Sequence, residues 1–468
     1  MPETTDTRTT TERTLLIKGA TVLTMDPEFG DLTTGDILVT GDRITAVGPD
    51  LDDRASADTE VIQARGMIAI PGLIDTHMHA WQTPLKGLYA HGWTGDDYQS
   101  HVFYLREHFR PEDIYDATFS GTVQMLDAGV TGVLDFCHNV MSPEGAEAGL
   151  RAHRATGQRA LFAYGMLGSF GAPPEDHAWR LDHVRRLHDE VNTGGDGLLR
   201  VGMALGSIEY GSMDRITKEV ALARELGLRM SVHQNPPGQI RALHEAGLLD
   251  SDIVPAHANS ADDGELELLA RCGGGISFTP EGEFGGGRSM TILNRAHRAG
   301  ASPSLGIDTH ARVSIDLFAA MRLTYLLMRN VDATTEREAG RWPLERHPGV
   351  PLVEPRDILA YATVNAAAAL GLGDDLGRLT PGRLADIVLI DTEPYGVALG
   401  DPAAHVVLQT TPRDVDTVVV GGRIRKRDGR LTDLDPTEAG AATRRVRERV
   451  FAEASAHGGP VPDLGPVR

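Results

Sequence analysis

Two histidines separated by one residue, His77 and His79, are the residues of this sequence whose type and spacing first predict chemistry. They end the segment Pro71-Gly-Leu-Ile-Asp-Thr-His-Met-His79, which overlaps an apolar run from Met67 to Ile74 that predicts a short buried strand. Residues two apart on a strand point to the same side, so both imidazoles face one point beyond the strand's carboxyl end. Neutral imidazole is a good ligand for zinc and iron, and the pair therefore predicts a metal site. A single His-x-His triplet also occurs by chance on protein surfaces, so the elements around it have to decide.

Composition excludes several classes of protein. The chain has 468 residues, of which 41% are hydrophobic and 24% charged, and these proportions are typical of a globular protein. Its net charge of −21 disfavours a nucleic acid or an anionic membrane surface as partner. Two cysteines give no disulfide framework, and neither an apolar leader nor an apolar run of about 18 residues is present, so we expect a cytoplasmic enzyme with a small-molecule substrate.

Strand-like and helix-like runs alternate through the middle of the chain, and this pattern predicts an α/β fold with a parallel sheet. Eight strands, the first beginning at Met67, would close a TIM-like (β/α)8 barrel. The seven later strands are expected at Gly132–Cys137, Ala160–Met166, Leu199–Leu205, Arg229–His233, Ile253–Ala256, Gly275–Thr279 and Ser304–Ile307.

Short strands with tight turns occur at both chain ends and resemble one another, which predicts a small β-sandwich domain built from both ends. The predicted division of the chain has four parts. They are a disordered polar tail at 1–13, the β-sandwich domain at 14–66 plus 376–435, the metal-binding barrel at 67–375, and a C-terminal helix and tail at 436–468.

The active site of such a barrel lies at the carboxyl ends of its strands. Three predicted strands end at or beside further candidates, namely His233, His257 and Asp308. Each is explained equally well, when taken singly, as a structural histidine or a capping aspartate. Together with the first histidine pair, however, they suit a catalytic divalent metal that keeps a position open for water. His138 follows the second predicted strand on the same side and is expected to form a hydrogen bond rather than to bind metal.

These residues, together with a closing segment Gly377-Arg-Leu-Thr-Pro-Gly-Arg-Leu-Ala-Asp386, resemble the amidohydrolase superfamily. The closer similarity is to its branch of cytosine/guanine deaminases and triazine hydrolases, and it extends from about Leu15 to Arg425. The resemblance implies a metal-binding (β/α)8 barrel flanked by a β-sandwich, and a homodimer or larger homo-oligomer. It also implies hydrolysis of a C–N or C–halogen bond in a small cyclic or amidine-like substrate.

Position by position, the resemblance implies a role for each candidate. The expected ion is one Zn²⁺ per chain, with Fe²⁺ as the alternative, and its ligands would be His77, His79, His233 and Asp308. His257 would contact the substrate or the oxyanion, and Asp308 would act as general base on the water. Gln82 matches a ring-contacting glutamine, or is a surface loop residue. Trp81 would stack on the substrate, or would pack under the loop.

Two features depart from the family pattern. Binuclear branches bridge two metals through a modified lysine near the end of strand four, but residues 199–210 contain no lysine, so we expect a single metal. Deaminases of this branch also carry a glutamate three residues after the strand-five histidine, where this chain has His233-Gln-Asn-Pro236. Losing such an acid typically costs ~10²–10⁴ in rate. The candidates to replace it are Glu209, Glu281, Glu283 and His310, although a solvated loop carboxylate is the commoner explanation of each acid.

The sequence therefore predicts a metal-dependent hydrolase of the deaminase type, with Glu209 and His310 also facing the substrate. The absent acid leaves a second hypothesis, in which the same metal site serves a lyase, a decarboxylase or an unusual hydrolase of a specialised metabolite. A third, a non-enzymatic scaffold, is disfavoured because the complete set of candidate ligands is present.

Overall fold

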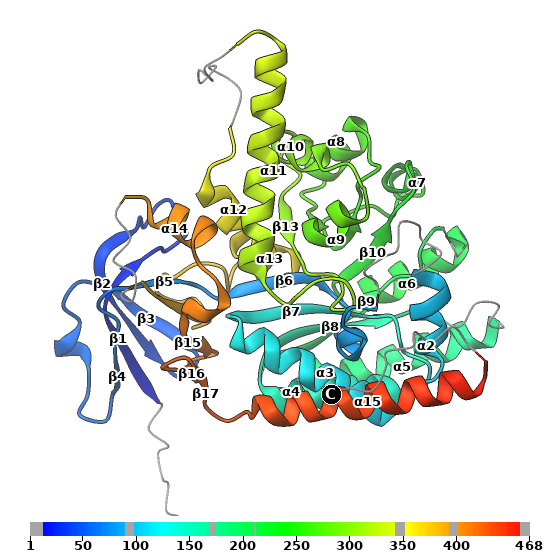
Figure 1. Cartoon of the computed structure of the whole chain (residues 1–468), viewed down its shortest axis with the longest axis horizontal. Helices are drawn as coiled ribbons and strands as arrows, with labels where there is room; N and C mark the ends of the chain where they lie inside the picture. The colour runs from blue at the N-terminus through cyan, green and yellow to red at the C-terminus, as the bar shows by residue number, and fades with distance from the viewer. Residues whose placement is uncertain are drawn as a thin grey trace, which may run out of the picture.

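The chain folds into a barrel of eight parallel strands and a separate mixed sheet formed by both chain ends (Figure 1). This computed structural model describes residues 13–88, 98–167, 174–193, 195, 197–209, 212–341, 352–392 and 400–458. The architecture confirms the predicted α/β barrel with a small second β unit. The polar tail expected at 1–13 lies almost wholly outside the described residues.

The barrel strands follow one another in chain order, each parallel to the next. They are β6 (Leu73–Met78), β7 (Val130–Cys137), β8 (Arg159–Gly165), β9 (Leu199–Ala204), β10 (Met230–Gln234), β11 (Ile253–His257), β12 (Ile276–Phe278) and β13 (Pro303–Leu305). Nearly every residue of these strands is buried, as is typical of parallel strands that have helices on one face and a packed interior on the other.

Backbone hydrogen bonds between β6 and the segment after β13 close the barrel. The Asp308 amide donates to the His77 carbonyl at 2.8 Å, and the His79 amide donates to the Asp308 carbonyl at 2.8 Å. Gly306 permits this approach, because a Cβ at that position would lie 2.7 Å from the His77 nitrogen. The seam therefore joins the first and last strands at residues that the sequence predicts as metal ligands.

The mixed sheet combines strands from both chain ends. Its members are β1 (Thr14–Val22), β2 (Leu32–Thr40), β3 (Arg43–Gly48), β4 (Glu60–Gln63), β5 (Met67–Pro71), β14 (Ile387–Asp391), β15 (Val415–Val420), β16 (Arg423–Arg427) and β17 (Arg430–Leu431). Leu15 and Ile37 from the first half share one buried apolar cluster with Ile387 and Val419 from the second. Burial of this cluster away from water holds the two ends of the chain together.

The apolar run from Met67 to Ile74 forms two strands, whereas the sequence predicts one. β5 pairs with β1 and β14 in the mixed sheet, and β6 begins the barrel after Gly72. A Cβ at Gly72 would lie 2.0 Å from Thr131 Oγ1, so only glycine fits where the chain passes from one sheet to the other. Periodicity does not reveal the break, because both strands are buried on both faces.

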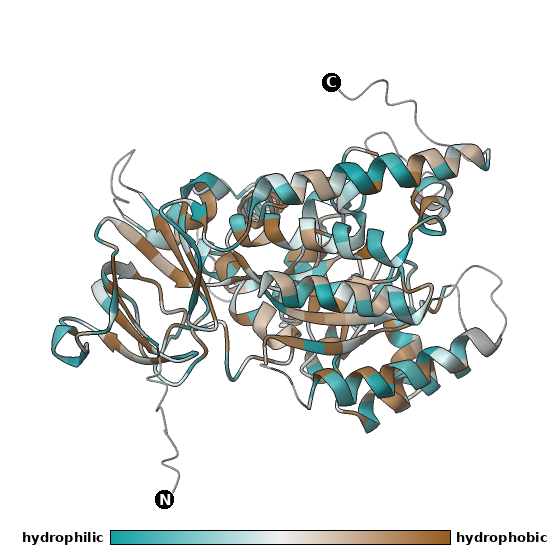
Figure 2. Cartoon of the chain, turned by 90° about the horizontal axis from the view of Figure 1, so that it is seen from below, coloured by the Kyte–Doolittle hydropathy of each residue, from teal (hydrophilic) through white to brown (hydrophobic). Residues whose placement is uncertain are grey.

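Helices surround the barrel and cover its outer face (Figure 2), with apolar residues toward the strands and hydrophilic ones outward. The short helical segments are η1 (Asp52–Arg54), η2 (Ala80–Leu85), η3 (Tyr98–Phe103), α2 (Tyr104–Arg106) and η5 (Pro412–Asp414). The other α-helices are α3 (Pro111–Asp127), α4 (Pro143–Thr156), α5 (Pro174–Val191), α6 (Met213–Glu225), α7 (Gln239–Glu245), α8 (Asp263–Arg271), α9 (Pro280–Gly285), α10 (Thr291–Ala299), α11 (Leu317–Glu338), α12 (Pro355–Tyr361), α13 (Val364–Ala369), α14 (Pro402–Leu408) and α15 (Pro436–Ala456).

The C-terminal helix α15 lies along α3 at one side of the barrel (Figure 1). It buries Val446 and Val450, and Thr443 Oγ1 lies 2.6 Å from Ser120 Oγ on α3. The helix lies within the predicted C-terminal part at 436–468. Among the described helices, none combines the length and apolar character that a membrane span needs.

A buried ion pair joins the barrel to the mixed sheet. Arg159 at the start of β8 donates through Nε to Asp386 Oδ2 at 2.8 Å and through Nη2 to Oδ1 at 2.9 Å. Both side chains are 3% exposed, and the Gly421 amide also donates to Asp386 Oδ1. This fork-to-fork geometry satisfies both charges, and Asp386 is the last residue of the closing segment singled out in the sequence.

Replacing Asp386 by Ala would leave the Arg159 guanidinium buried without its counter-charge. We expect the free energy of unfolding to fall by about 3–5 kcal/mol, measured by urea denaturation followed by circular dichroism. The matched control is Glu225→Ala, which removes the partner of exposed Arg185 and should leave the free energy of unfolding nearly unchanged. Equal losses for the two variants would contradict a structural role for the buried pair.

Candidate active site

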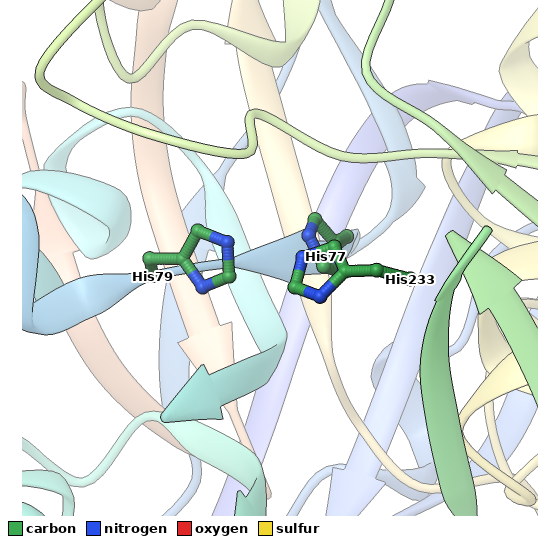
Figure 3. A group of neighbouring side chains, drawn as sticks. All are labelled: His77, His79 and His233. Atoms are coloured by element: carbon green, nitrogen blue, oxygen red, sulfur yellow. The ribbon is translucent and has the colours of Figure 1, made fainter. Parts of the chain in front are cut away.

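The four candidate metal ligands and His257 converge at the carboxyl end of the barrel. Ligand atoms of His77, His79 and His233 lie within 4.8 Å of one another, and the same is true of His77, His257 and Asp308. Figure 3 shows the first three imidazoles gathered together, two from the end of β6 and one from β10. The topology of the barrel thus brings together residues that lie far apart in the sequence.

The neighbouring strand β7 fixes the ring of His79. His79 Nδ1 donates to the Phe136 carbonyl at 2.7 Å, so Nδ1 carries the proton and Nε2 keeps its lone pair. The next amide, of Ala80, donates to Asp135 Oδ1 at 3.1 Å, and His153 Nε2 lies 3.0 Å from Asp135 Oδ2. A carbonyl that accepts a hydrogen bond from one ring nitrogen fixes the orientation of the imidazole, so the other nitrogen is directed at a metal.

His77 is fully buried, and neither of its ring nitrogens has a hydrogen-bond partner among the described residues. Its backbone amide donates to Asp75 Oδ1 at 3.0 Å, and the same oxygen accepts from the Ile307 amide at 3.2 Å. Burial raises the pKa of Asp75 well above its usual range, although the two backbone hydrogen bonds lower it. Asp75 therefore ties the seam together beneath the site.

Asp308 follows β13 in the left-handed backbone region, with φ of 68°. Its Oδ1 lies 3.4 Å from His79 Nε2 and 3.6 Å from His77 Nε2. His257 also has a positive φ, of 72°. Such conformations are uncommon for residues other than glycine and often occur at functional sites.

The remaining two imidazoles complete the cluster. The ring centroid of His233 lies 4.9 Å from that of His77, and the ring of His257 lies 5.0 Å from it. The His233 and His257 rings lie 5.5 Å apart with planes only 18° from parallel.

Glu283 holds His257 from behind. His257 Nδ1 lies 3.1 Å from Glu283 Oε1, which also accepts from the Thr279 amide at 3.0 Å. The other carboxylate oxygen of Glu283 accepts from Asn259 Nδ2 at 3.1 Å. The Nε2 side of the His257 ring is therefore directed at the other histidines and Asp308, while Nδ1 is taken.

This arrangement corrects the prediction of a flexible loop with solvated acids after strand seven. The segment forms α9, and Glu283 is 2% exposed. Glu281 lies two residues before Glu283 in the same helix. Burial and the charge of Asp316 raise the pKa of Glu281 to about 7. Within the described part of the chain, Glu281 does not line the cavity above the histidines.

Electrostatics favour the protonation states that a metal requires. Burial and the charges of neighbouring histidines lower the pKa values of His77 and His233 well below the usual range, so both imidazoles are neutral. Burial would raise the pKa of Asp308, but the neighbouring imidazoles of His79 and His257 lower it overall, so its carboxylate is ionised. Two neutral imidazoles and an ionised carboxylate therefore lie beside His79.

These residues fit a divalent cation. The buried Nε2 of His77 lacks a partner among the described residues, and a cation would provide one. The Nδ1 proton of His79 directs its Nε2 lone pair into the same space. Nitrogen ligands with one carboxylate are the donor set of catalytic zinc and of non-haem iron.

A cavity of about 310 Å³ opens above this cluster. His79, His233, His257 and Asp308 line its base. Its walls combine apolar, polar and charged side chains, among them Phe103, Phe136, Leu205, Ser207, Glu209, Asn235, Arg288, Thr309 and Arg312. The volume and the mixed lining are typical of a small-molecule site.

Two predicted substrate contacts lie beneath the cavity instead. Trp81 is fully buried, donates through Nε1 to His138 Nδ1 at 3.1 Å and packs on Phe109, so it takes the packing alternative. The bond also supports the prediction for His138, whose ring centroid lies 4.0 Å from that of His79. Gln82 is fully buried and bonded to Thr309, so it is neither a surface residue nor, in the described part of the chain, a cavity-lining one.

His310 is also absent from the described lining of the cavity. Burial and the charge of Lys86 lower its pKa to about 3, so its imidazole is neutral at pH 7. A neutral, buried ring outside the cavity does not supply a proton to a bound substrate.

Glu209, by contrast, lines the cavity after β9, near the position where binuclear relatives carry a lysine. Asn235 takes a place on the wall close to where the missing glutamate would stand. Arg288 and Arg312 are the functional candidates that the sequence does not reveal. Arginines in loops are usually solvated, and nothing in their spacing marks these two.

The chain matches a known protein family and known relatives over most of its length. Residues 68–425 match the amidohydrolase family model. The chain is 29% identical over 466 residues to the 5-methylthioadenosine/S-adenosylhomocysteine deaminase of Pelotomaculum thermopropionicum, and the alignment covers 94% of this chain and 97% of the relative.

Solved structures share the fold. An adenosine deaminase from Xanthomonas campestris with bound zinc superposes with a TM-score of 0.80 at 21% identity, over 94% of this chain and 98% of that one. A variant of the atrazine chlorohydrolase of Arthrobacter aurescens, with zinc and atraton, gives 0.78 at 24% identity over 92% and 100%. With most of its length matched by the family model, the chain belongs to the amidohydrolase family and is a metal-dependent hydrolase of non-peptide carbon–nitrogen bonds.

Proposed function

We propose that this protein is a zinc-dependent deaminase of an amino-bearing heterocycle, such as the adenine ring of a nucleoside. The observation that carries the proposal is the meeting of His77, His79 and His233 with an ionised Asp308 at the base of a small-molecule cavity. The name of the Pelotomaculum relative, a deaminase of adenosine derivatives, supports the same substrate class.

In this proposal a single zinc ion is held by His77, His79, His233 and Asp308. When bound, zinc lowers the pKa of water toward neutrality and so supplies a nucleophile. The absence of lysine from residues 199–210 supports one ion rather than two.

The residues around the ion carry the proton transfers. Asp308 accepts a proton from the attacking water, whose oxygen forms the bond to the ring carbon. His257, fixed by Glu283, stabilises the charge that develops on the substrate. As the exocyclic C–N bond breaks, the amino group takes the proton that Asp308 accepted and leaves as ammonia, and the remaining proton of the attached oxygen returns to the group that protonated the ring.

Glu209 is our choice to replace the absent glutamate. Asp308 and Glu209 are the two carboxylates that line the cavity in the described part of the chain. Since Asp308 is engaged with the histidines, Glu209 is the group that protonates the ring nitrogen. Trp81, Gln82 and His310 act behind the wall and do not touch the substrate in this proposal.

The lyase or decarboxylase alternative is not favoured, because the family and the named relative are hydrolytic. Two further expectations stay predictions: a cytoplasmic location and a homodimer or larger homo-oligomer.

Metal content tests the ligand set. Protein purified without chelator should contain one zinc per chain, and His79→Ala should lose it, because three ligands hold zinc far less tightly than four. Glu209→Gln should keep it. Mass spectrometry of the metal gives the stoichiometry; two ions, one of them lost with Glu209→Gln, would show a bridged pair instead.

Glu209→Gln should lower kcat for ammonia release about 10²–10⁴-fold, because glutamine cannot transfer the proton. The assay compares zinc-loaded variants on aminopurine nucleosides and amino-triazines. A near-normal kcat in the variant would assign the proton transfer to another group. No ammonia from any aminated ring with the wild type would contradict the deaminase itself.

Glu283→Gln tests whether the orientation of His257 matters. Loss of a carboxylate that orients an active-site histidine typically lowers activity about 10–100-fold. We therefore expect kcat to fall by about that factor while zinc content stays unchanged. Glu281→Gln is the matched control in the same helix and should change kcat less than about threefold. Similar losses in both variants would indicate disruption of α9 rather than of His257.

A further inference from the structure

The cavity wall above β12 and β13 carries two arginines, Arg288 and Arg312, that the proposed reaction does not use. We propose that they form a carboxylate-binding subsite, so that the substrate is a small amino-bearing molecule with an anionic group remote from the reacting carbon. This inference rests on the proposed function for the reacting end of the substrate and adds the recognition of its other end.

Arg312 lies directly beside the metal-binding cluster. A Cβ built on Gly282 would lie 3.7 Å from Arg312 Cδ and 3.6 Å from Asp308 Oδ2, so the two side chains flank the same glycine. Arg312 Nη1 donates to the Gly282 carbonyl at 2.5 Å, which anchors the guanidinium on α9.

Arg288 is connected to the other side of the cluster. Its Nη1 donates to Asn259 Oδ1 at 3.2 Å, and Asn259 in turn donates to Glu283, the residue that holds His257. Among the described carboxylates none lies within 4.0 Å of the Arg288 guanidinium. A guanidinium has five N–H donors, and Asn259 accepts from one of them, which leaves this exposed head able to bind an anion.

The charges divide the cavity into two sides. Glu209 follows β9, and Arg312 follows β13; in the ring of eight strands, three strands separate β9 from β13 in either direction. The acid and this arginine therefore lie across the barrel from each other. A substrate that presents its ring nitrogen toward Glu209 and an anion toward the arginines would match both sides.

Carboxylate is the anion that this geometry favours. The planar guanidinium fork pairs with the two oxygens of a carboxylate, and two forks on one wall fix its orientation. The chain as a whole carries a net charge of −21, so a local pair of cations is needed to attract an anionic substrate to this cavity.

The test compares benzoate with benzamide, which have the same shape but differ in charge, by isothermal titration of the zinc-loaded full-length protein. Benzoate should bind the wild-type protein. Its affinity for the double variant R288Q/R312Q should be lower by roughly tenfold or more, because the hydrogen bonds from the two guanidinium groups to the carboxylate are lost. The affinity for benzamide should not change. Arg295→Gln is the matched control. It alters an arginine on α10 that pairs with Asp263 on α8, and it should bind benzoate like the wild type.

Three controls show what a change in benzoate binding means. Zinc content and the thermal unfolding midpoint of each variant show whether the site is intact. Titration of the metal-free protein shows whether benzoate binds the ion instead. Benzoate binding that is unchanged in R288Q/R312Q, or that is lost equally with benzamide binding, would overturn the subsite. Arginine-dependent benzoate binding in an enzyme that releases no ammonia would support the subsite and refute only the deaminase.

Discussion

Two backbone hydrogen bonds at the seam between β6 and β13 are the constraint on which the rest of this structure depends. They link Asp308 to His77 and His79, so the same contact closes the barrel and assembles one side of the cluster of candidate metal ligands. Gly306 makes the approach sterically possible, and Asp75 ties the two strands together below it. Fold and site are therefore not separable here: a barrel that did not close would also have no ligand set, because its first and last strands each supply part of it.

Above the seam, burial sets the chemistry. Burial and crowding lower the pKa values of His77 and His233, whereas the neighbouring histidines lower the pKa of Asp308 and keep its carboxylate ionised. Supporting residues on neighbouring strands remove the remaining freedom: Phe136 fixes His79 by its carbonyl oxygen, and Glu283 fixes His257 by its carboxylate. The cluster is thus preorganised as a set of lone pairs directed at one point, which limits the reorganisation required when a cation binds.

The departures from the family pattern are concentrated on the cavity wall rather than at its base. Pro236 stands where a catalytic glutamate is expected, and Asn235 beside it faces the cavity. Charged groups on the wall come from other strands: Glu209 follows β9, and Arg288 lies in the segment after β12. A conserved reaction type with a new substrate would produce this distribution, since the base of the site serves the chemistry and the wall serves recognition.

The sequence by itself determined the architecture and the candidate ligands. Alternating strand and helix patterns predicted the barrel, and the strand-end positions of His77, His79, His233, His257 and Asp308 predicted that they would meet. It did not determine the break at Gly72, because buried strands on either side of a glycine have one continuous apolar pattern. Nor did it distinguish Glu283, buried against His257, from Glu281, or place Trp81 under the cavity and Arg312 on its wall. Those distinctions depend on which way a side chain turns and what packs against it, and only the tertiary structure fixes both.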